Sequence, residues 1–346
     1  MDGVIRACYA DVADVGELRS RVLGQLRRVV DFDAAFFAAA DPETLLFTAA
    51  FADEALVESG PAFLANEFAD APDVNRFATL ASSADAVATL DAATAGSRAH
   101  SPRWREIMAP LGMGDEARVA LRVEGSTWGF LCLHRSGEVG FGRRDTEALR
   151  RLAPHLGEAI RRTAVATTHH QGATDATGPG LIIAVDDHVV AVGGAGEEWL
   201  ARFGPSDARI GDPLPLPLRS VVRRLETLER AGTQGPPAAM RLVADDATLV
   251  SVHASRLRDN AGAASVALTF TAADAGARAS LLLVAHGLTP AQRRIAQLVL
   301  RGRTTRQIMQ ELRISEHTVQ DHLKAVFDKF DVRSRRDLVA VLMPSG

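Results

Sequence analysis

The alternation of apolar and polar residues predicts a mixed α/β unit at the start of the chain. Residues 14–30 carry apolar positions at helical spacing. Strand-like runs follow at 32–40 and 44–51, around the turn dipeptide Asp41-Pro42. An Ala-rich stretch over 53–110 is expected to be helical.

A hairpin and a long helix close this first segment. Apolar runs at 117–123 and 127–135 flank Glu124-Gly125, a pair typical of tight hairpin turns. Residues 143–165 then predict an amphipathic helix with Leu149, Leu152, Leu156 and Ile160 on one stripe. Residues 1–166 therefore form one α+β domain.

The middle of the chain predicts a second small sheet. Residues 167–179 are rich in Thr, Gly and Ala and are interpreted as a linker. From 180 to 274, two apolar runs flank Asp186-Asp187, and helices are expected around Trp199-Leu200 and over 219–230. Further strands are predicted at 239–244, 248–258 and 264–271.

The C-terminal pattern is wholly helical. Residues 275–287 contain a short apolar helix, either a strip that packs against the preceding domains or a connector that transmits their state. Residues 288–346 predict four short helices, with Thr289, Thr304 and Ser315 as N-caps. The expected fold is multidomain: two α+β domains, then an all-α four-helix domain.

The third of these helices has two chemically different faces. At 100° per residue the apolar face is expected to be buried and comprises Val319, His322, Leu323, Val326 and Phe330. The opposite face carries His317, Gln320, Asp321 and Lys324, which we call the recognition face. Gln pairs with adenine, Lys with guanine, and Asp accepts from cytosine in the major groove. The alternative is a solvated face on which Asp321 pairs with Lys324.

Residues 288–342 resemble the LuxR/GerE-type helix-turn-helix family. The resemblance runs through Leu288-Thr289-Pro290, Gly302, Ile308, Ile314-Ser315-Glu316, Thr318-Val319, His322, Lys329, Val332-Arg333-Ser334-Arg335 and Leu338-Val339. It implies base contacts from the recognition face and a buried structural role for His322. It implies DNA-backbone contacts from Thr304, Ser315, Thr318, Lys329, Arg333 and Arg335, and a dimer contact through Leu338, Val339 and Leu342. Gln292, Gln307 and Gln320 depart from the charged residues common in the family.

Charge and lysine usage narrow the class of regulator. From Leu281 onward the chain carries 11 basic against 6 acidic residues, while the remainder is acidic. Lys324 and Lys329 are the only lysines, and the arginine bias indicates a bacterium with GC-rich DNA. Phosphoacceptor receiver domains and P-loop ATPases both need a lysine that residues 1–323 lack, so these two control domains are excluded.

The first segment resembles a GAF sensor domain, through Arg105-Glu106-Ile107, Pro110-Leu111-Gly112-Met113, Trp128-Gly129 and Phe141-Gly142. The second resembles a PAS-like fold, through Ala184-Val185-Asp186-Asp187 and Glu198-Trp199-Leu200. The GAF resemblance implies a pocket for an unknown small ligand. Its candidate liners, which could equally be ordinary core, are Phe63, Phe68, Trp104, Met108 and Met113.

Other site chemistry is not expected. Cys8 and Cys132 are isolated thiols, so neither a disulfide nor a metal site is predicted, and a buried Cys132 does not suit a covalent chromophore. Haem ligation by His134 or His155 has no supporting motif. The pairs Asp115-Glu116 and Asp186-Asp187 are interpreted as turn carboxylates, and no catalytic constellation is found.

These observations predict a cytoplasmic, homodimeric bacterial transcription regulator without a membrane segment. Its expected partner is a double-stranded operator with an inverted repeat, and RNA polymerase is a candidate second partner. Two alternatives remain open: a ligand-free dimerisation scaffold that carries the DNA-binding module, and an enzyme with a regulatory DNA-binding tail.

Overall fold

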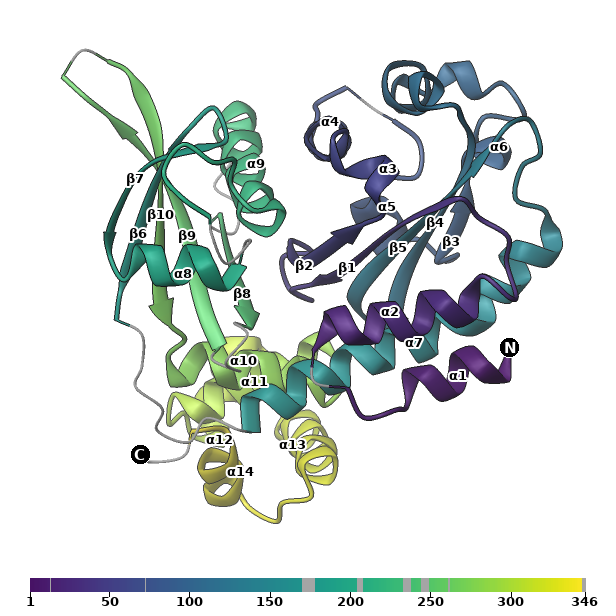
Figure 1. Ribbon diagram of the computed structural model, residues 1–346. Coiled ribbons are helices and arrows are strands. Elements are labelled where there is room, and N and C mark those ends of the chain that lie inside the picture. Colours follow the sequence, from purple (N-terminus) through teal and green to yellow (C-terminus); the bar gives the residue numbers. More distant parts are fainter. Residues whose placement is uncertain are drawn as a thin grey trace. The chain divides into compact units, whose positions relative to one another are not determined.

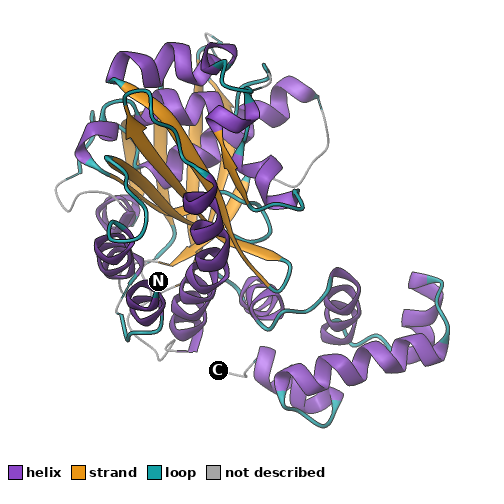
Figure 2. Ribbon diagram, turned by 90° about the vertical axis from the view of Figure 1, so that its right-hand side faces the viewer, coloured by secondary structure: helices purple, strands orange, loops and turns teal. Residues whose placement is uncertain are grey.

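The structure is a computed structural model that describes residues 1–12, 14–71, 73–169, 178–203, 208–232, 238–243, 249–260 and 262–343. Two compact units divide the chain: residues 1–123 with 127–272, and residues 273–346 with 124–126. Both sheets lie in the first unit, and the second is helical (Figures 1 and 2). The predicted linker at 167–179 falls mostly on residues 170–177, outside the described residues.

The first sheet has five strands in the order β2-β1-β5-β4-β3. The strands are β1 (Ala34–Ala40), β2 (Phe47–Ala52), β3 (Val87–Thr89), β4 (Met113–Val123) and β5 (Ser126–Ser136). The predicted hairpin joins β4 to β5, and its turn residues Glu124 and Gly125 have φ of 49° and 78°. Left-handed φ at both central positions suits the twist of a two-residue hairpin.

Helices α2 (Val15–Leu26) and α7 (Arg143–His169) cover one face of this sheet, and α1 (Asp2–Cys8) packs against these two helices (Figure 1). The predicted stripe of α7 is confirmed, because Leu149, Leu152, Leu156 and Ile160 are all buried. Gly157 lets α7 lie close to β4, since an added Cβ there would sit 3.0 Å from the backbone of Leu121.

The other face is covered by short elements rather than one helical stretch. They are α3 (Glu54–Val57), α4 (Gly60–Glu67), α5 (Phe77–Ser82), α6 (Leu90–Ala93), a π-helical turn (Trp104–Met108) and 3-10 turns Arg98–His100 and Ala109–Leu111. The prediction of helix throughout 53–110 is wrong at β3, which pairs with β4 through Val87 opposite Val119. Pairing with a neighbouring strand overrides the local helix propensity of alanine there.

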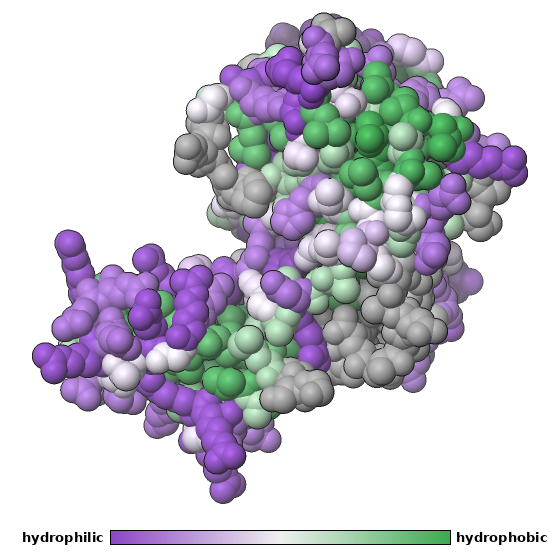
Figure 3. All heavy atoms as spheres, turned by 90° about the vertical axis from the view of Figure 1, so that its left-hand side faces the viewer, coloured by the Kyte–Doolittle hydropathy of each residue, from purple (hydrophilic) through white to green (hydrophobic). Residues whose placement is uncertain are grey.

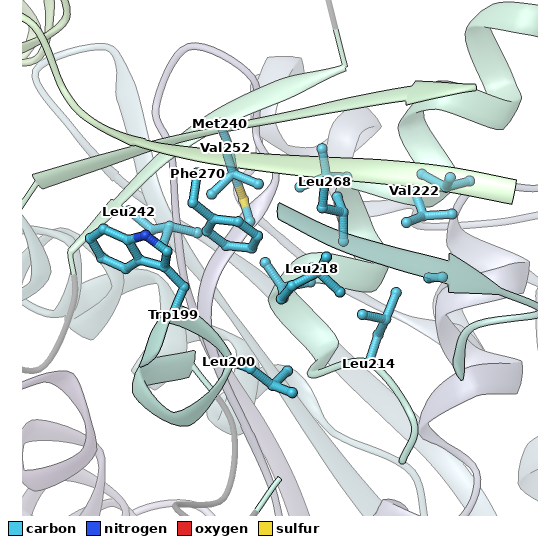
Figure 4. Close-up of a cluster of buried hydrophobic side chains, with 14 of the residues drawn as sticks. Trp199, Leu200, Leu214, Leu218, Val222, Met240, Leu242, Val252, Leu268 and Phe270 are labelled. Carbon is cyan, nitrogen blue, oxygen red and sulfur yellow. The ribbon is translucent and has the colours of Figure 1, made fainter. Parts of the chain in front are cut away.

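The second sheet has the order β7-β6-β10-β9-β8, which is the topology of the first sheet repeated. Its strands match the predicted runs: β6 (Gly180–Val185), β7 (His188–Gly194), β8 (Ala239–Val243), β9 (Leu249–Arg258) and β10 (Ala264–Ala272). Helices α8 (Gly196–Phe203) and α9 (Leu216–Ala231) cover one face. Trp199 and Phe270 stack in the core between helices and sheet (Figure 4), and the partly buried Phe203 stacks on both rings. The face of the second sheet that α8 and α9 leave uncovered also carries exposed apolar residues, and Figure 3 shows this face.

The two sheet domains of this unit share a buried ion pair. Asp41 follows β1 and is 2% exposed, and its carboxylate accepts hydrogen bonds from the backbone and guanidinium of Arg241 on β8 at 2.7–3.1 Å. Leu46, which precedes β2, is buried with the core of the second sheet. The turn that joins β1 to β2 is therefore part of both domains.

The helical unit contains α10 (Ala275–Ala285), α11 (Pro290–Leu300), α12 (Thr305–Leu312), α13 (Glu316–Phe330) and α14 (Arg335–Leu342). Leu282 and Leu283 of α10 are buried with Ile295, Val299 and Leu323 in one apolar core. This places α10 inside the module, so the compact unit begins near Ala273 rather than at Leu288. Transmission of the state of the preceding domains through α10 stays a prediction.

Candidate nucleic-acid interface and sensor cavity

Helix α13 begins and ends at defined caps. Ser315 Oγ accepts from the backbone N–H of Thr318 at 3.1 Å, which satisfies one of the free donors of the first turn. The helix ends at Asp331, whose φ of 52° stops helical hydrogen bonding. These two residues fix where α13 begins and ends.

The buried face of α13 matches the prediction except at one residue. Val319, Leu323, Val326 and Phe330 are at most 8% exposed and pack into the module core. His322 is half-buried rather than buried.

The recognition face projects from the module. His317, Gln320, Asp321 and Lys324 are all exposed. His317 Nε2 lies 3.4 Å from Asp321 Oδ2, one helical turn apart, so these two side chains meet. Among the described residues, Gln320 and Lys324 make no hydrogen bond or ion pair, and their polar atoms are free to contact an external group.

The residues predicted at the DNA backbone fall into two groups. Thr304 and Ser315 are exposed N-caps, Thr318 is half-buried, and Arg333 is exposed. Lys329 and Arg335 are instead held within the module. Lys329 donates from Nζ to the carbonyl of Gly287, and Arg335 donates to Arg303 O at 3.0 Å and Thr305 Oγ1 at 2.8 Å.

Two of the three residues predicted for the dimer contact on α14 are buried, and Val339 is half-buried. Leu338 and Leu342 are 0% exposed and belong to the core of their own module, and Val339 packs against that core. The predicted dimer contact through α14 stays a prediction, and the two leucines themselves are taken up by the module core. The apolar residue that α14 does expose is Val341, at 42%.

A cavity of about 60 Å³ lies between the first sheet and its short helices, and Leu216 of α9 also lines it. Its wall is largely aromatic, and one side carries charged, thiol and imidazole groups. The principal liners are Phe36, Phe47, Phe63, Phe77, Glu67, Glu116, Arg118, Cys132 and His134.

Only one of the predicted ligand liners reaches this cavity. Phe63 lines it, whereas Trp104, Met108 and Met113 pack in an adjoining apolar cluster with Leu56 and Leu90. Phe68 lies outside it, in a groove between α4 and α9. The choice of large apolar residues in the helical stretch missed the liners on the strands, because apolar residues on a strand also look like ordinary core.

An ion network lies beneath the cavity. Arg103 donates to Glu116 Oε2 from Nε at 3.1 Å and Nη2 at 2.7 Å, and both side chains are 0% exposed. Arg118 donates to Glu67 at 2.7 Å, and its Nε lies 3.0 Å from Glu116 Oε1. Asp73 lies 3.5 Å from Arg103. The interpretation of Asp115-Glu116 as turn carboxylates is wrong, because both are buried within β4.

Electrostatics in this network favour a charged Glu116 and a neutral His134. Burial alone would raise the pKa of Glu116, but the guanidinium groups of Arg103 and Arg118 hold it below its usual value. Burial lowers the pKa of His134 to about 4, and burial together with Glu116 raises the pKa of Cys132 well above its usual value.

Cys132 and His134 are close enough to form a nucleophile–base pair, but their chemistry opposes that role. Cys132 Sγ lies 3.3 Å from His134 Nε2 and donates to Glu116 Oε1 at 3.2 Å. A thiol nucleophile requires a lowered pKa and a neighbouring cation that stabilises the thiolate. Here the acceptor of the thiol is a carboxylate, which stabilises the protonated form.

Comparison with known proteins identifies the helical module. A family model described as bacterial regulatory proteins of the luxR family matches residues 286–342. The spore germination protein GerE of Bacillus subtilis (strain 168) is 36% identical over 59 residues, which are 17% of this chain and 80% of that protein. The chain belongs to the LuxR family of bacterial regulatory proteins.

A second family model, the GAF domain, matches residues 14–160 of this LuxR-family chain. The protein is therefore a DNA-binding regulator of the LuxR/GerE type that also carries a GAF domain, with a second sheet domain between the two. Regulators of this family are typically non-enzymatic. No helix in the described residues is long and apolar enough to span a membrane.

Solved structures resemble the chain only distantly. SdiA of Escherichia coli is 14% identical, with a TM-score of 0.35 over 98% of this chain and 94% of SdiA. Bacteriophytochrome RpBphP3 of R. palustris is 12% identical, with a TM-score of 0.32 over 78% of this chain and 62% of that protein.

Two departures from the LuxR pattern keep their structural role. Gln292 and Gln307 occupy the third position of α11 and α12 and complete capping boxes with Thr289 and Thr304. The Gln292 Oε1 also lies 3.4 Å from Lys329 Nζ. An amide oxygen can accept from the N-cap backbone as a carboxylate does, so replacing Glu by Gln leaves both helix starts intact.

Proposed function

We propose that the chain regulates transcription by placing α13 in the major groove of an operator. The observation that carries this proposal is the polarity of α13. Val319, Leu323 and Val326 anchor one face in the module, while Gln320 and Lys324 project from the other face without partners among the described residues. Gln and Lys side chains free of internal bonds can form the adenine and guanine contacts of direct readout.

The proposed complex contains two copies on an inverted repeat. Each module contacts one half-site, with roughly 34 Å between the centres of the two. Thr304, Ser315, Thr318 and Arg333 are placed at the phosphates, and Lys329 and Arg335 support the module instead. The exposed face of α14, with Val341, is the proposed contact between copies.

The proposed control lies in the two sheet domains. A small ligand in the GAF cavity changes the packing of the GAF domain. Helix α10 transmits this change to the DNA-binding module. A PAS-like role for the second sheet domain is supported by its strand order, which repeats that of the GAF sheet. We also expect the protein to act in the cytoplasm and to contact RNA polymerase.

DNA footprinting of the full chain on an operator selected from random sequence tests the proposal. Lys324→Ala and Gln320→Ala should each weaken specific binding by about 1–3 kcal/mol, with preference relaxed at one base position. Gln310→Ala is the matched control, because Gln310 is exposed on α12 and outside the recognition face. Loss of binding by the control, or wild-type footprints from both variants, would refute the assignment of this face.

A further inference from the structure

Three potential metal donors meet in the wall of the GAF cavity. Glu116 on β4 and Cys132 and His134 on β5 each offer one donor atom, and these atoms lie within 4.8 Å of one another. Cys132 and His134 are two residues apart on one strand, so their side chains point to the same face of the sheet. Glu116 reaches them from the neighbouring strand, β4.

From this arrangement we propose that Glu116, Cys132 and His134 bind one divalent transition-metal ion of the Zn²⁺ type. Around a tetrahedral Zn²⁺, a sulfur and a nitrogen or oxygen donor are about 3.6 Å apart, given bond lengths of about 2.3 and 2.0–2.2 Å. The sulfur lies 3.2 Å from Glu116 Oε1 and 3.3 Å from His134 Nε2. These two distances would each lengthen by a few tenths of an ångström for both donors to bind one ion with the sulfur.

His134 provides an independent observation. It is 2% exposed, its Nδ1 makes no hydrogen bond among the described residues, and its Nε2 faces only the weak partner Cys132. Nε2 is therefore the proposed ligand atom, and Nδ1 is a second buried nitrogen without a partner among the described residues. Neutral imidazole, thiolate and carboxylate together form a donor set that suits Zn²⁺ and excludes Mg²⁺ and Ca²⁺ as preferred ions.

The surrounding charges accommodate a dication. Glu67, Asp73 and Glu116 carry three negative charges, against two positive charges on Arg103 and Arg118. Binding deprotonates the Cys132 thiol, and the released proton leaves to solvent. The thiolate brings the cluster to −2, which the ion neutralises. Arg103 keeps its bonds to Glu116 Oε2 and orients that carboxylate, as outer groups commonly do around metal ligands.

Three protein ligands leave a fourth position, and Glu116, Cys132 and His134 all line the cavity. The open position would therefore face the aromatic wall, where water or a small donor molecule could complete the shell. Use of this site to control DNA binding depends on the proposed function, whereas metal binding itself does not. The decisive experiment therefore measures the metal and not the DNA.

The experiment uses the full chain, freed of metal by a chelator and titrated with Co²⁺ as a spectroscopic probe. The expected result is one equivalent per chain with a thiolate-to-cobalt charge-transfer band and release of one proton. Cys132→Ser should abolish the band and weaken binding at least about 100-fold. Cys8→Ser is the matched control, because Cys8 is an equally buried thiol (2% exposed) on α1 and should leave the band unchanged.

X-ray absorption of the wild-type Zn²⁺ complex keeps the proposal testable if Cys132→Ser does not fold. One sulfur at about 2.3 Å, with nitrogen or oxygen at about 2.0–2.1 Å, is expected. Absence of stoichiometric binding, a shell without sulfur, or a band that Cys8→Ser removes would each overturn the site. A metal that binds as described but does not change the footprint would leave the site standing and remove only its regulatory use.

Discussion

The recognition face of α13 and the wall of the GAF cavity both carry polar side chains. Those of the first are exposed, whereas those of the second are buried and paired. Lys324 and Gln320 are exposed and make no internal bond among the described residues. Arg103, Glu116 and Arg118 are at most 3% exposed and are held in a network of ion pairs. Polar groups kept free in water can accept a new partner at little cost, whereas buried ones must already be balanced.

This difference separates two kinds of function. On the recognition face, specificity comes from side chains that exchange water for base edges. In the cavity, the position of each donor is fixed before anything binds, and the supporting arginines fix it. Substitutions should therefore affect binding on the first surface and folding on the second.

The largest expected effect is in the buried network. Arg103→Ala leaves Glu116 and Asp73 without their shared cation, and should lower the free energy of unfolding by about 3–5 kcal/mol in urea titrations. Arg143→Ala removes an exposed ion pair with Glu147 and should change the free energy of unfolding by less than about 1 kcal/mol. Equal effects from the two variants would mean that burial does not distinguish these pairs.

The two lysines should differ in the same way within one helix. Lys329→Ala removes a charged hydrogen bond to the Gly287 carbonyl, and should destabilise the helical module by about 1–3 kcal/mol. Lys324→Ala should leave its stability unchanged. Thermal unfolding followed by circular dichroism measures both. If the Lys329→Ala variant is as stable as the wild type but has a relaxed base preference, Lys329 contacts bases and does not support the module.

The smallest expected effect is at a helix start. Thr304→Ala removes the side-chain acceptor for the Gln307 N–H and should cost about 1 kcal/mol of module stability. Thr304→Ser keeps the acceptor and serves as its control. If the serine variant loses affinity for DNA without losing stability, the methyl group of Thr304 contacts the operator.

The sequence predicted the elements whose signals are local. Both hairpin turns, at Glu124-Gly125 and Asp186-Asp187, carry the left-handed φ that such dipeptides favour. The caps at Thr289, Thr304 and Ser315 were also predicted, because an N-cap and its partner lie three residues apart. The exposure of the recognition face follows from helical periodicity alone.

The cavity could not be predicted in this way, because its residues come together only through strand pairing. Glu116 is 13 residues from Arg103 and 16 from Cys132, and no periodicity indicates that they meet. A carboxylate beside glycines resembles a turn until its buried partners are known. Leu338 and Leu342 show the converse, since an apolar stripe fits an intermolecular contact and a core equally well.

The glutamine-based caps of α11 and α12 affect how the starts of these helices respond to low pH. Neither helix has an acidic residue in its first turn, so no carboxylate there can be protonated as the pH falls. Helix starts held by Glu lose the carboxylate charge on acidification and their cap hydrogen bond weakens, whereas the amide acceptors of Thr289–Gln292 and Thr304–Gln307 do not change. The first two helices of this DNA-binding module should thus keep their ends in acid that would loosen those of a glutamate-capped relative.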